Sequence, residues 1–380
     1  MAAPKLRFKE FDGDWSAQKY KDVLTIKYGK DHKLLEDGEI PVYGTGGVMR
    51  YVNQYLYDGE SILIGRKGTI DQPKYVNEKF WTVDTLFYSE IKQNIYPLFI
   101  YQHALQVNWL GLNEATGVPS LNTTSINNVD IYLPSKEEQT KIASFLSAVD
   151  EKISQLTQKN FLLSQYKQGM MQKLFSQQIR FKAVDGSEFG EWEEKKLSEI
   201  CLKIKDGTHF SPKTFEVGEY KYLTSKNVKN GYLDFSNLEF VSTDDHKKIY
   251  SSCDVKFGDV LLTKDGTIGQ CCVNTLTEEF SLLSSVAFLR LKSEFNNYFL
   301  YHILLSDLGQ KEINGAIAGQ ALKRITLTKI NDFKFMFPCL AEQTKIANFL
   351  SAIDQKIEVV AQQIEQAKQW KKGLLQQMFV

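Results

Sequence analysis

Short loops rich in glycine, threonine, asparagine, lysine and arginine recur along this chain, and residues of these types can contact nucleic acid. Glycine lets backbone amides approach phosphates, and arginine, lysine, asparagine and glutamine can read base edges. A solvated loop has the same composition, so it is the recurrence in both halves that favours this interpretation; His209 alone fits a structural turn residue better than a base reader. The candidate DNA contacts are Thr45, Gly46, Arg50, Arg66, Lys67 and Thr116 in the first half, and Lys205, Thr208, His209, Lys213, Ser225, Lys226, Asn227, Lys264, Asp265, Gln320, Lys323 and Arg324 in the second.

Residue patterns of known catalytic sites are missing from the sequence. Without adjacent prolines there is no Asn/Asp-Pro-Pro-aromatic motif of amino-methyltransferases, and Gly29-Lys30 is not followed by the Ser or Thr of a phosphate-binding P-loop. The five histidines are scattered, and no cysteine spacing suits zinc. Glu193-Glu194-Lys195 resembles the end of a nuclease motif, but it lies in a charged connector. We therefore predict no catalytic residue, no metal site and no cofactor in this chain.

Composition bounds the class of protein. The 380 residues include 46 Lys+Arg and 46 Asp+Glu, so any DNA binding must come from local patches and not from a global positive field. No apolar run is long enough to span a bilayer, which predicts no membrane contact. The five cysteines all lie in the second half without a paired framework, and no signal peptide is visible, which predicts a cytoplasmic protein.

The elements that must position these loops are built from an internal repeat. EQTKIASFLSAVDEKI at 138–153 returns as EQTKIANFLSAIDQKI at 342–357, with 13 of 16 positions identical. Apolar residues recur every seven positions after each copy, in two seams interrupted by polar residues such as Asn160 and Lys167, which predicts two long coiled-coil helices. At 1.5 Å per residue, helices of some 40 residues are about 60 Å long.

The globular parts repeat more faintly. GESILIGRKGTI (59–70) parallels GDVLLTKDGTI (258–268), and Arg7-Phe8-Lys9 parallels Arg180-Phe181-Lys182. Because the sequence that follows the first helix also opens the chain, we predict a cyclic repeat with a pseudo-twofold axis and neighbouring termini. The predicted fold is α/β (α+β), with two mixed heads separated by two antiparallel helices: 1–133 first head, 134–178 first helix, 179–337 second head and 338–380 second helix.

Together, the repeated Glu-Gln-x-Lys-Ile-Ala helices and the turns GDVLLTKDGTIG (258–269) and IKDGTHFSP (204–212) resemble the specificity subunit of Type I restriction–modification systems over essentially the whole chain. The resemblance implies two target recognition domains that each read one half of a bipartite double-stranded DNA sequence. It also implies two modification subunits that bring S-adenosylmethionine-dependent adenine methylation, and restriction subunits that bring ATP- and Mg-dependent translocation and cleavage. The first half departs from the pattern, with YGTGG where DGTH is expected and IGRKGTID without the second glycine.

Repeated polar residues on the helices are candidates for docking two identical modification subunits. We predict that they lie on the face of each helix turned away from the other helix. The alternative is a coiled-coil scaffold with two protein-binding heads, which explains the helices and the neutral charge but not the paired basic glycine turns. A fused restriction–methylation enzyme is excluded by the missing motifs and by length. The candidate docking residues are Gln139, Lys141, Lys152 and Gln172, matched by Gln343, Lys345, Lys356 and Gln376.

Overall fold

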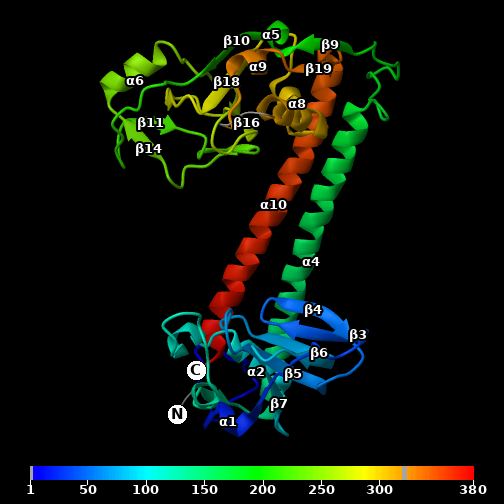
Figure 1. The fold of residues 1–380 in the computed structure, drawn as a ribbon, viewed down its shortest axis with the longest axis vertical. Helices are drawn as coiled ribbons and strands as arrows, with labels where there is room; N and C mark the ends of the chain where they lie inside the picture. The colour runs from blue at the N-terminus through cyan, green and yellow to red at the C-terminus, as the bar shows by residue number, and fades with distance from the viewer. Residues whose placement is uncertain (1–2, 319–322) are drawn as a thin grey trace. The chain divides into compact units, whose positions relative to one another are not determined.

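The structure is a computed structural model that describes residues 3–318 and 323–380 (Figure 1). The chain divides into two compact units: unit 1 holds the chain up to 158 together with 361–380, and unit 2 holds 159–360. Each unit contains one α/β head and a part of both long helices. Of the candidate DNA contacts, Gln320 lies outside the described residues.

Both predicted long helices are present, as α4 (Lys136–Phe175) and α10 (Leu340–Met378). Pro134 and Pro338 precede them, and Ser135 Oγ accepts from the amide of Glu138 at 3.3 Å, as its place at the helix start predicts. Only one stripe of each long helix is buried and apolar, and polar and charged residues cover the rest of its surface.

Polar residues that interrupt the apolar seams join the two helices within each unit. In unit 1, Lys371 of α10 bonds Asp150 of α4 at 2.6 Å. In unit 2, Lys167 of α4 bonds Asp354 of α10 at 2.5 Å, and Asn160 Nδ2 donates to the carbonyl of Ile357 at 3.1 Å. The two ion pairs occupy matching positions of the repeat, so the same three-dimensional contact is built twice.

A repeated two-stranded ladder connects each head to the start of a long helix. In unit 1, β1 (Ser16–Lys19) pairs antiparallel with β8 (Asp130–Leu133); in unit 2, β9 (Glu193–Lys196) pairs antiparallel with β19 (Lys334–Phe337). The residue that follows β1 or β9 then donates its amide to Val129 or Phe333 at 2.9 Å. The chain therefore enters and leaves each head at the same place.

The glutamate of the repeated motif anchors the segment that precedes each head. Arg7 makes a bidentate ion pair with Glu138 at 2.7 and 2.8 Å, and Arg180 does the same with Glu342 at 3.1 and 2.7 Å. Both glutamates are almost completely buried. A bidentate arginine is the partner that such a buried carboxylate needs.

The glutamine of the motif clamps the head to the helix, which corrects the prediction that Gln139 and Gln343 lie on the outer helix face. Gln139 accepts from the Tyr96 amide at 2.9 Å and donates to the Pro134 carbonyl at 3.0 Å. Gln343 makes the equivalent bonds at 2.9 and 2.8 Å. Both side chains are about 2% exposed or less, so they are unavailable for docking a partner.

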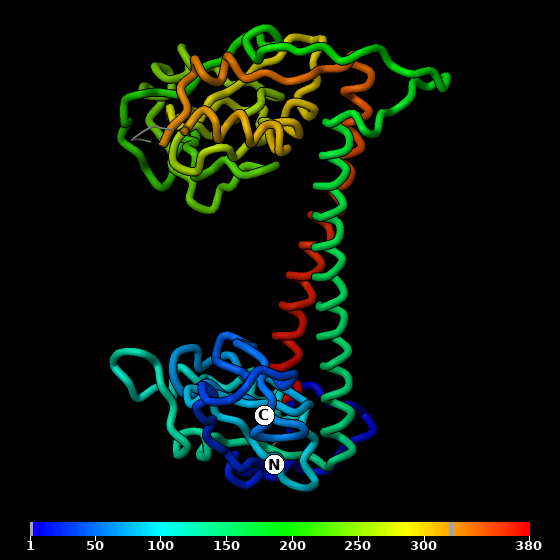
Figure 2. The backbone as a smooth tube through the Cα atoms, turned by 45° about the vertical axis from the view of Figure 1, so that its right-hand side comes forward, coloured from blue at the N-terminus to red at the C-terminus, as the bar shows by residue number. Residues whose placement is uncertain are grey.

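The two termini meet in unit 1, as the cyclic repeat predicts (Figure 2). The amide of Leu6 donates to the carbonyl of Gln377 near the end of α10 at 2.8 Å. In unit 2 the amide of Ile179 donates to the carbonyl of Lys173 near the end of α4 at 3.2 Å. The opening segment of the chain thus caps α10 in the way that the connector after α4 caps α4.

Unit 1 is built around a six-stranded sheet of order β2-β7-β5-β6-β3-β4. Its central strand β5 carries the apolar run of GESILIG, and every residue from Ser61 to Gly65 is buried. Helix α2 (Pro97–Ala104) packs against β5 and β6. The sheet strands are β2 (Leu24–Tyr28), β3 (Asp37–Gly44), β4 (Gly47–Val52), β5 (Tyr57–Gly65), β6 (Lys74–Thr82) and β7 (Leu86–Ile91); the short helices are α1 (Tyr20–Val23), η1 (Trp109–Leu112) and α3 (Thr123–Asn127).

Unit 2 divides the corresponding strands between a four-stranded sheet, β10-β18-β15-β16, and a three-stranded sheet, β14-β11-β17. Its central strand β15 (Val260–Thr263) is buried throughout, as the apolar run of GDVLLT predicts. The other strands are β10 (Cys201–Asp206), β11 (Tyr220–Leu223), β12 (Val228–Lys229), β13 (Tyr232–Leu233), β14 (Glu239–Val241), β16 (Cys271–Val273), β17 (Ser281–Leu282) and β18 (Val286–Leu291); the helices are α5 (Leu197–Ile200), α6 (Thr243–Tyr250), α7 (Asn297–Leu305), α8 (Asp307–Ile317) and α9 (Leu327–Asn331).

No helix in the described ranges 3–318 and 323–380 is long and apolar enough to cross a membrane.

The residue beside the ion pair between the long helices differs between the units. This difference predicts that the stability of unit 2 depends on pH. In unit 1, Gln102 of α2 donates to Asp150 at 2.9 Å; at the matching place in unit 2, His302 of α7 is fully buried, 3.9 Å from Asp354. Burial lowers the pKa of His302 to about 3, so the folded state holds it neutral. The unfolded state, with an ordinary pKa near 6.5, binds the extra proton first. Stability is therefore present above about pH 6.5 and is lost as the pH falls toward 3.

We expect His302→Gln to weaken this acid sensitivity. Between pH 6.5 and 4.5 the wild-type chain should lose roughly 2 to 3 kcal/mol of unfolding free energy through this one group, at about 1.4 kcal/mol per pH unit. Urea unfolding at pH 7 and pH 5 measures the difference. The matched control is Gln102→His, which should add acid sensitivity to unit 1. Parallel pH profiles for wild type and His302→Gln would contradict the prediction.

Candidate nucleic-acid interface

The first loop of the candidate interface follows the first sheet strand of each head. In unit 2 it is Asp206-Gly207-Thr208, where the Thr208 amide donates to the Leu282 carbonyl at 2.7 Å. In unit 1 the amide of Lys30 donates to the Thr82 carbonyl at 2.8 Å, so the matching loop is Tyr28-Gly29-Lys30. A Cβ at Gly29 or Gly207 would lie 1.9 Å from a carbonyl oxygen, so both positions require glycine.

The backbone contacts of the second loop show a different correspondence between the two heads from the one expected from sequence. YGTGG (43–47) is not the counterpart of the DGTH turn; it matches LTSKN (223–227). Tyr43 accepts from the Val83 amide at 3.1 Å, and Leu223 accepts from the Leu283 amide at 2.9 Å. Each loop follows a strand that pairs parallel with its neighbour, β3 with β6 and β11 with β17.

The third loop confirms the predicted parallel between GESILIGRKGTI and GDVLLTKDGTI. The amides of Arg66 and Lys67 both donate to the Thr85 carbonyl, at 2.9 and 3.2 Å. The amides of Lys264 and Asp265 both donate to the Ser285 carbonyl, at 2.9 and 3.3 Å.

Two more matched segments complete the cluster, and sequence reasoning missed the first of them. Residues 82–85 and 282–285 form backbone bonds with all three loops, and each directly precedes a buried strand, which is the signal that could have located it. Residues 119–121 and 324–325 close the cluster, because Leu121 donates to the Arg66 carbonyl at 2.9 Å and Ile325 to the Lys264 carbonyl at 2.8 Å. Five loops are thus brought together in each unit by one set of backbone bonds.

The side chains that join the first loop to the third differ between the units, although they make the same connection. In unit 2, Lys264 forms an ion pair with Asp206 at 3.0 Å, and both side chains are about nine-tenths buried. At the matching positions of unit 1, the Arg66 guanidinium lies 5.5 Å from the centre of the Tyr28 ring. A cation–π contact takes the place of an ion pair and ties the first loop to the third in both units.

The structure places the candidate DNA contacts in three groups. The prediction fails for Asn227 and Lys264, because both side chains are buried and have internal partners; Asn227 accepts from the Thr224 amide at 2.9 Å and donates to Asp234 at 3.0 Å. Thr208 and Ser225 are also buried, whereas Thr45, Arg50 and Arg66 are half-buried. The exposed candidates are Gly46, Lys67, Thr116, Lys205, His209, Lys213, Lys226, Asp265, Lys323 and Arg324.

Of the candidate docking residues, two lysines have partners in the segment that precedes each head. Lys141 lies 3.5 Å from Glu10, and Lys345 donates to the Lys182 carbonyl at 2.5 Å. Sequence reasoning missed exposed aromatic residues on the same helices: Tyr166 and Trp370 occupy matching positions and are 51% and 55% exposed. The other four candidates, Lys152, Gln172, Lys356 and Gln376, are exposed.

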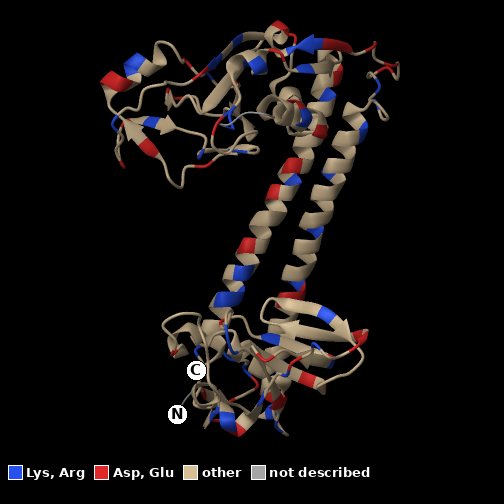
Figure 3. Ribbon diagram, viewed as in Figure 1, with Lys and Arg blue, Asp and Glu red and all other residues tan. Residues whose placement is uncertain are grey.

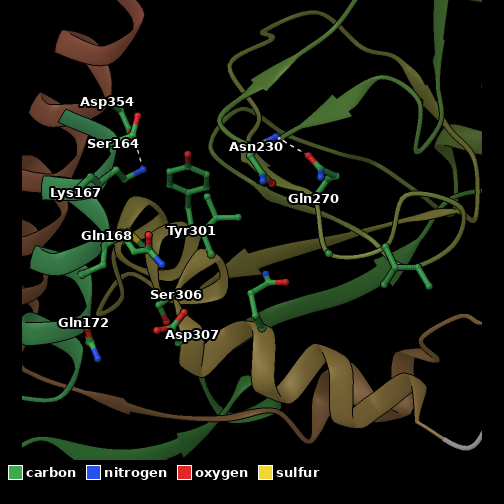
Figure 4. A pocket seen from close by; sticks show the side chains of 15 residues that line it. Ser164, Lys167, Gln168, Gln172, Asn230, Gln270, Tyr301, Ser306, Asp307 and Asp354 are labelled. Carbon is green, nitrogen blue, oxygen red and sulfur yellow. Dashed lines mark hydrogen bonds and ion pairs between the residues drawn. The ribbon is translucent and has the colours of Figure 1, made fainter. Parts of the chain in front are cut away.

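Charges of both signs are distributed along the heads and helices (Figure 3). The pocket in Figure 4 lies between α4 and the head of unit 2, where Lys167 and Asp354 form their ion pair. Its lining includes Tyr301, Asn230 and Gln270, but none of the candidate DNA contacts. In the described part of the chain, no cluster of histidine, cysteine or carboxylate side chains could hold a metal ion.

Two α/β heads with the same loop architecture, each clamped to the start of a long helix, define a duplicated head-and-helix protein. The model of the family "Type I restriction modification DNA specificity domain" matches residues 12–163 and 190–369. The chain belongs to this family.

Known proteins of this kind cover nearly the whole chain. The Type I restriction enzyme MjaVIII specificity subunit of Methanocaldococcus jannaschii is 27% identical, covering 97% of this chain and 94% of that protein. A putative type I specificity subunit of Mycoplasma pneumoniae is 23% identical over 88% of both chains. The crystal structure of the S subunit from M. genitalium has a TM-score of 0.67 at 16% identity, covering 100% of this chain and 99% of that one. The last comparison shows the fold.

Proposed function

We propose that this chain is the non-catalytic subunit that selects the DNA sequence in a Type I restriction–modification complex. Each head reads one half of a bipartite duplex target through its five loops, and α4 and α10 form an antiparallel coiled-coil spacer between the half-sites. The observation that carries the proposal is the matched loop cluster. One backbone framework occurs twice, yet it presents different side chains, as two readers of different half-sites require.

The arrangement of polar groups suits this task. Exposed Lys67, Lys205 and Lys226 can contact phosphates, and exposed Arg324 can read a guanine edge. A chain of net charge zero can serve as the reader because partner subunits can supply phosphate contacts. A rigid spacer limits the cost of engaging the second half-site after the first.

Catalysis belongs to the partners in this proposal. Two modification subunits would bring S-adenosylmethionine and methylate adenine, and restriction subunits would bring ATP and Mg. The exposed residues Tyr166 and Trp370, with Lys152 and Lys356, repeat at matching positions and can dock two copies of one modification subunit.

The intact methylase should contain two modification subunits for each copy of this chain. Native mass spectrometry of the purified complex measures this ratio. Tyr166→Ala with Trp370→Ala should weaken docking, because each removes an exposed aromatic side chain of the kind that dominates interfaces. Val184→Ala, at a more exposed apolar residue in the connector between α4 and β9, is the control. A single modification subunit in a fully active complex would contradict the symmetric docking.

The alternative of a protein-binding scaffold predicts no preference for the target duplex over a scrambled one. If the heads contact phosphates, the affinity of the complex for its duplex should fall linearly in a log–log plot against salt concentration. Fluorescence anisotropy with the modification subunits present measures it, with a scrambled duplex as competitor. Equal binding of target and scrambled duplexes would favour the scaffold.

A further inference from the structure

The head of unit 1 contains one element that is connected differently in the described residues of unit 2. After loop 43–47 the chain returns along β3 as β4, and the two strands form a ribbon at the edge of the sheet. After the matching loop of unit 2 the chain instead forms the short hairpin of β12 and β13. In unit 2 the edge place beside β11 is taken by β14, which follows that hairpin, so the directly connected β3–β4 ribbon is specific to the first head.

The outer strand of this ribbon presents apolar side chains to solvent. Val48, Met49 and Tyr51 are 45%, 62% and 53% exposed. The ladder pairs Val42 with Arg50 and Tyr43 with Val48, so Met49 is the unpaired residue of a β-bulge. Bulges re-aim side chains and are common next to functional sites. The Met49 sulfur lies 2.6 Å from where a Cβ of Gly44 would stand, so this side chain packs over Gly44 near the ribbon tip.

The two ends of the ribbon differ in charge. At the tip, the Lys74 ammonium lies 3.7 Å from the Cβ position of Gly47, and Thr45 Oγ1 lies 3.8 Å from that of Gly68, beside exposed Lys67. At the opposite end, the carboxylates of Glu36 and Asp37 are exposed. A polyanion would therefore approach the tip, where the ribbon is continuous with the loop cluster.

We propose that the β3–β4 ribbon enters the major groove of the half-site read by the first head, and that Val48 and Met49 contact thymine methyl groups. This proposal rests on the proposed function. A two-stranded ribbon fits the major groove, and the 5-methyl group is the apolar feature that distinguishes thymine there. Arg50, held by Asp37 at 2.5 Å and by the Leu35 carbonyl at 3.2 Å, braces the ribbon and does not read bases.

Replacing thymine by deoxyuridine tests this contact, because it removes the methyl group and leaves base pairing intact. The probes are duplexes of the mapped target in which one thymine at a time is replaced. With the complete methylase, at least one replacement should weaken binding about fourfold, the value expected for one buried methyl-sized group. In Val48→Ser with Met49→Ser, the thymine and deoxyuridine duplexes at that position should bind equally. Tyr232→Ser, at an exposed residue of the β12–β13 hairpin, should keep the fourfold ratio.

The outcomes separate this inference from the function on which it rests. Equal binding of every deoxyuridine duplex by the wild type, or an unchanged ratio in the double variant, would overturn the ribbon contact while sequence-selective binding persists. Binding of a scrambled duplex as tight as that of the target would instead overturn the proposed function.

Discussion

Exchanging residues 182–337 for the corresponding segment of a relative should change one half of the methylated sequence and leave the other half and the spacing intact. All described loops of the unit 2 cluster lie in this segment, and the long helices α4 and α10 lie outside it. The attachment survives the exchange, because the Arg180–Glu342 ion pair lies outside the segment and Gln343 bonds to the backbone amide of residue 296. Each mismatched base pair costs about 1–3 kcal/mol, so two or three new positions should change site preference by roughly 30-fold or more.

Sequencing of methylated adenines in cells that carry the exchanged chain measures this outcome. The reciprocal exchange of residues 9–133 serves as the control and should change only the other half. If one exchange altered both halves, or if neither altered the motif, the heads would not be the readers.

A charge placed in the seam between the helices should disrupt assembly. Val149 and Ile353 occupy matching positions, are 6% and 5% exposed, and belong to the hydrophobic cores of unit 1 and unit 2. Val149→Asp or Ile353→Asp would bury a carboxylate without a partner and cost several kcal/mol of unfolding free energy. We expect a large fall in the thermal unfolding midpoint and loss of methylation at the whole target, including the half whose head is unchanged.

The same helices provide controls for this effect. Lys152→Asp and Lys356→Asp introduce the same side chain at exposed positions and should leave the unfolding midpoint nearly unchanged. Normal methylation by either seam variant would show that the helices do not act as one spacer.

The long helices were predictable because their signal is periodic and repeated. The role of the Glu-Gln pair in the motif was not, because its partners lie far away in sequence: Glu138 bonds Arg7, and Gln139 bonds the amide of Tyr96. A polar pair on an amphipathic helix is ordinarily solvated, and only the packed head shows that this one is buried.

The correspondence between the loops of the two heads could not be predicted from sequence either. Shared glycine and threonine made YGTGG resemble DGTH, but backbone bonds with 82–85 and 282–285 decide which loops correspond. Burial of Asn227 and Lys264 also depends on tertiary partners that no local pattern reveals. The Lys264–Asp206 ion pair of unit 2 matches the Arg66–Tyr28 cation–π contact of unit 1. Because the two contacts use different residue types, the match is not visible in the sequence.

A map of methylated adenines in DNA modified by the complete methylase tests the central claim most directly. Two different heads joined by a fixed spacer predict one asymmetric sequence in two specified parts, separated by unspecified bases of constant number. A single continuous motif, or methylation that does not depend on this chain, would contradict the account.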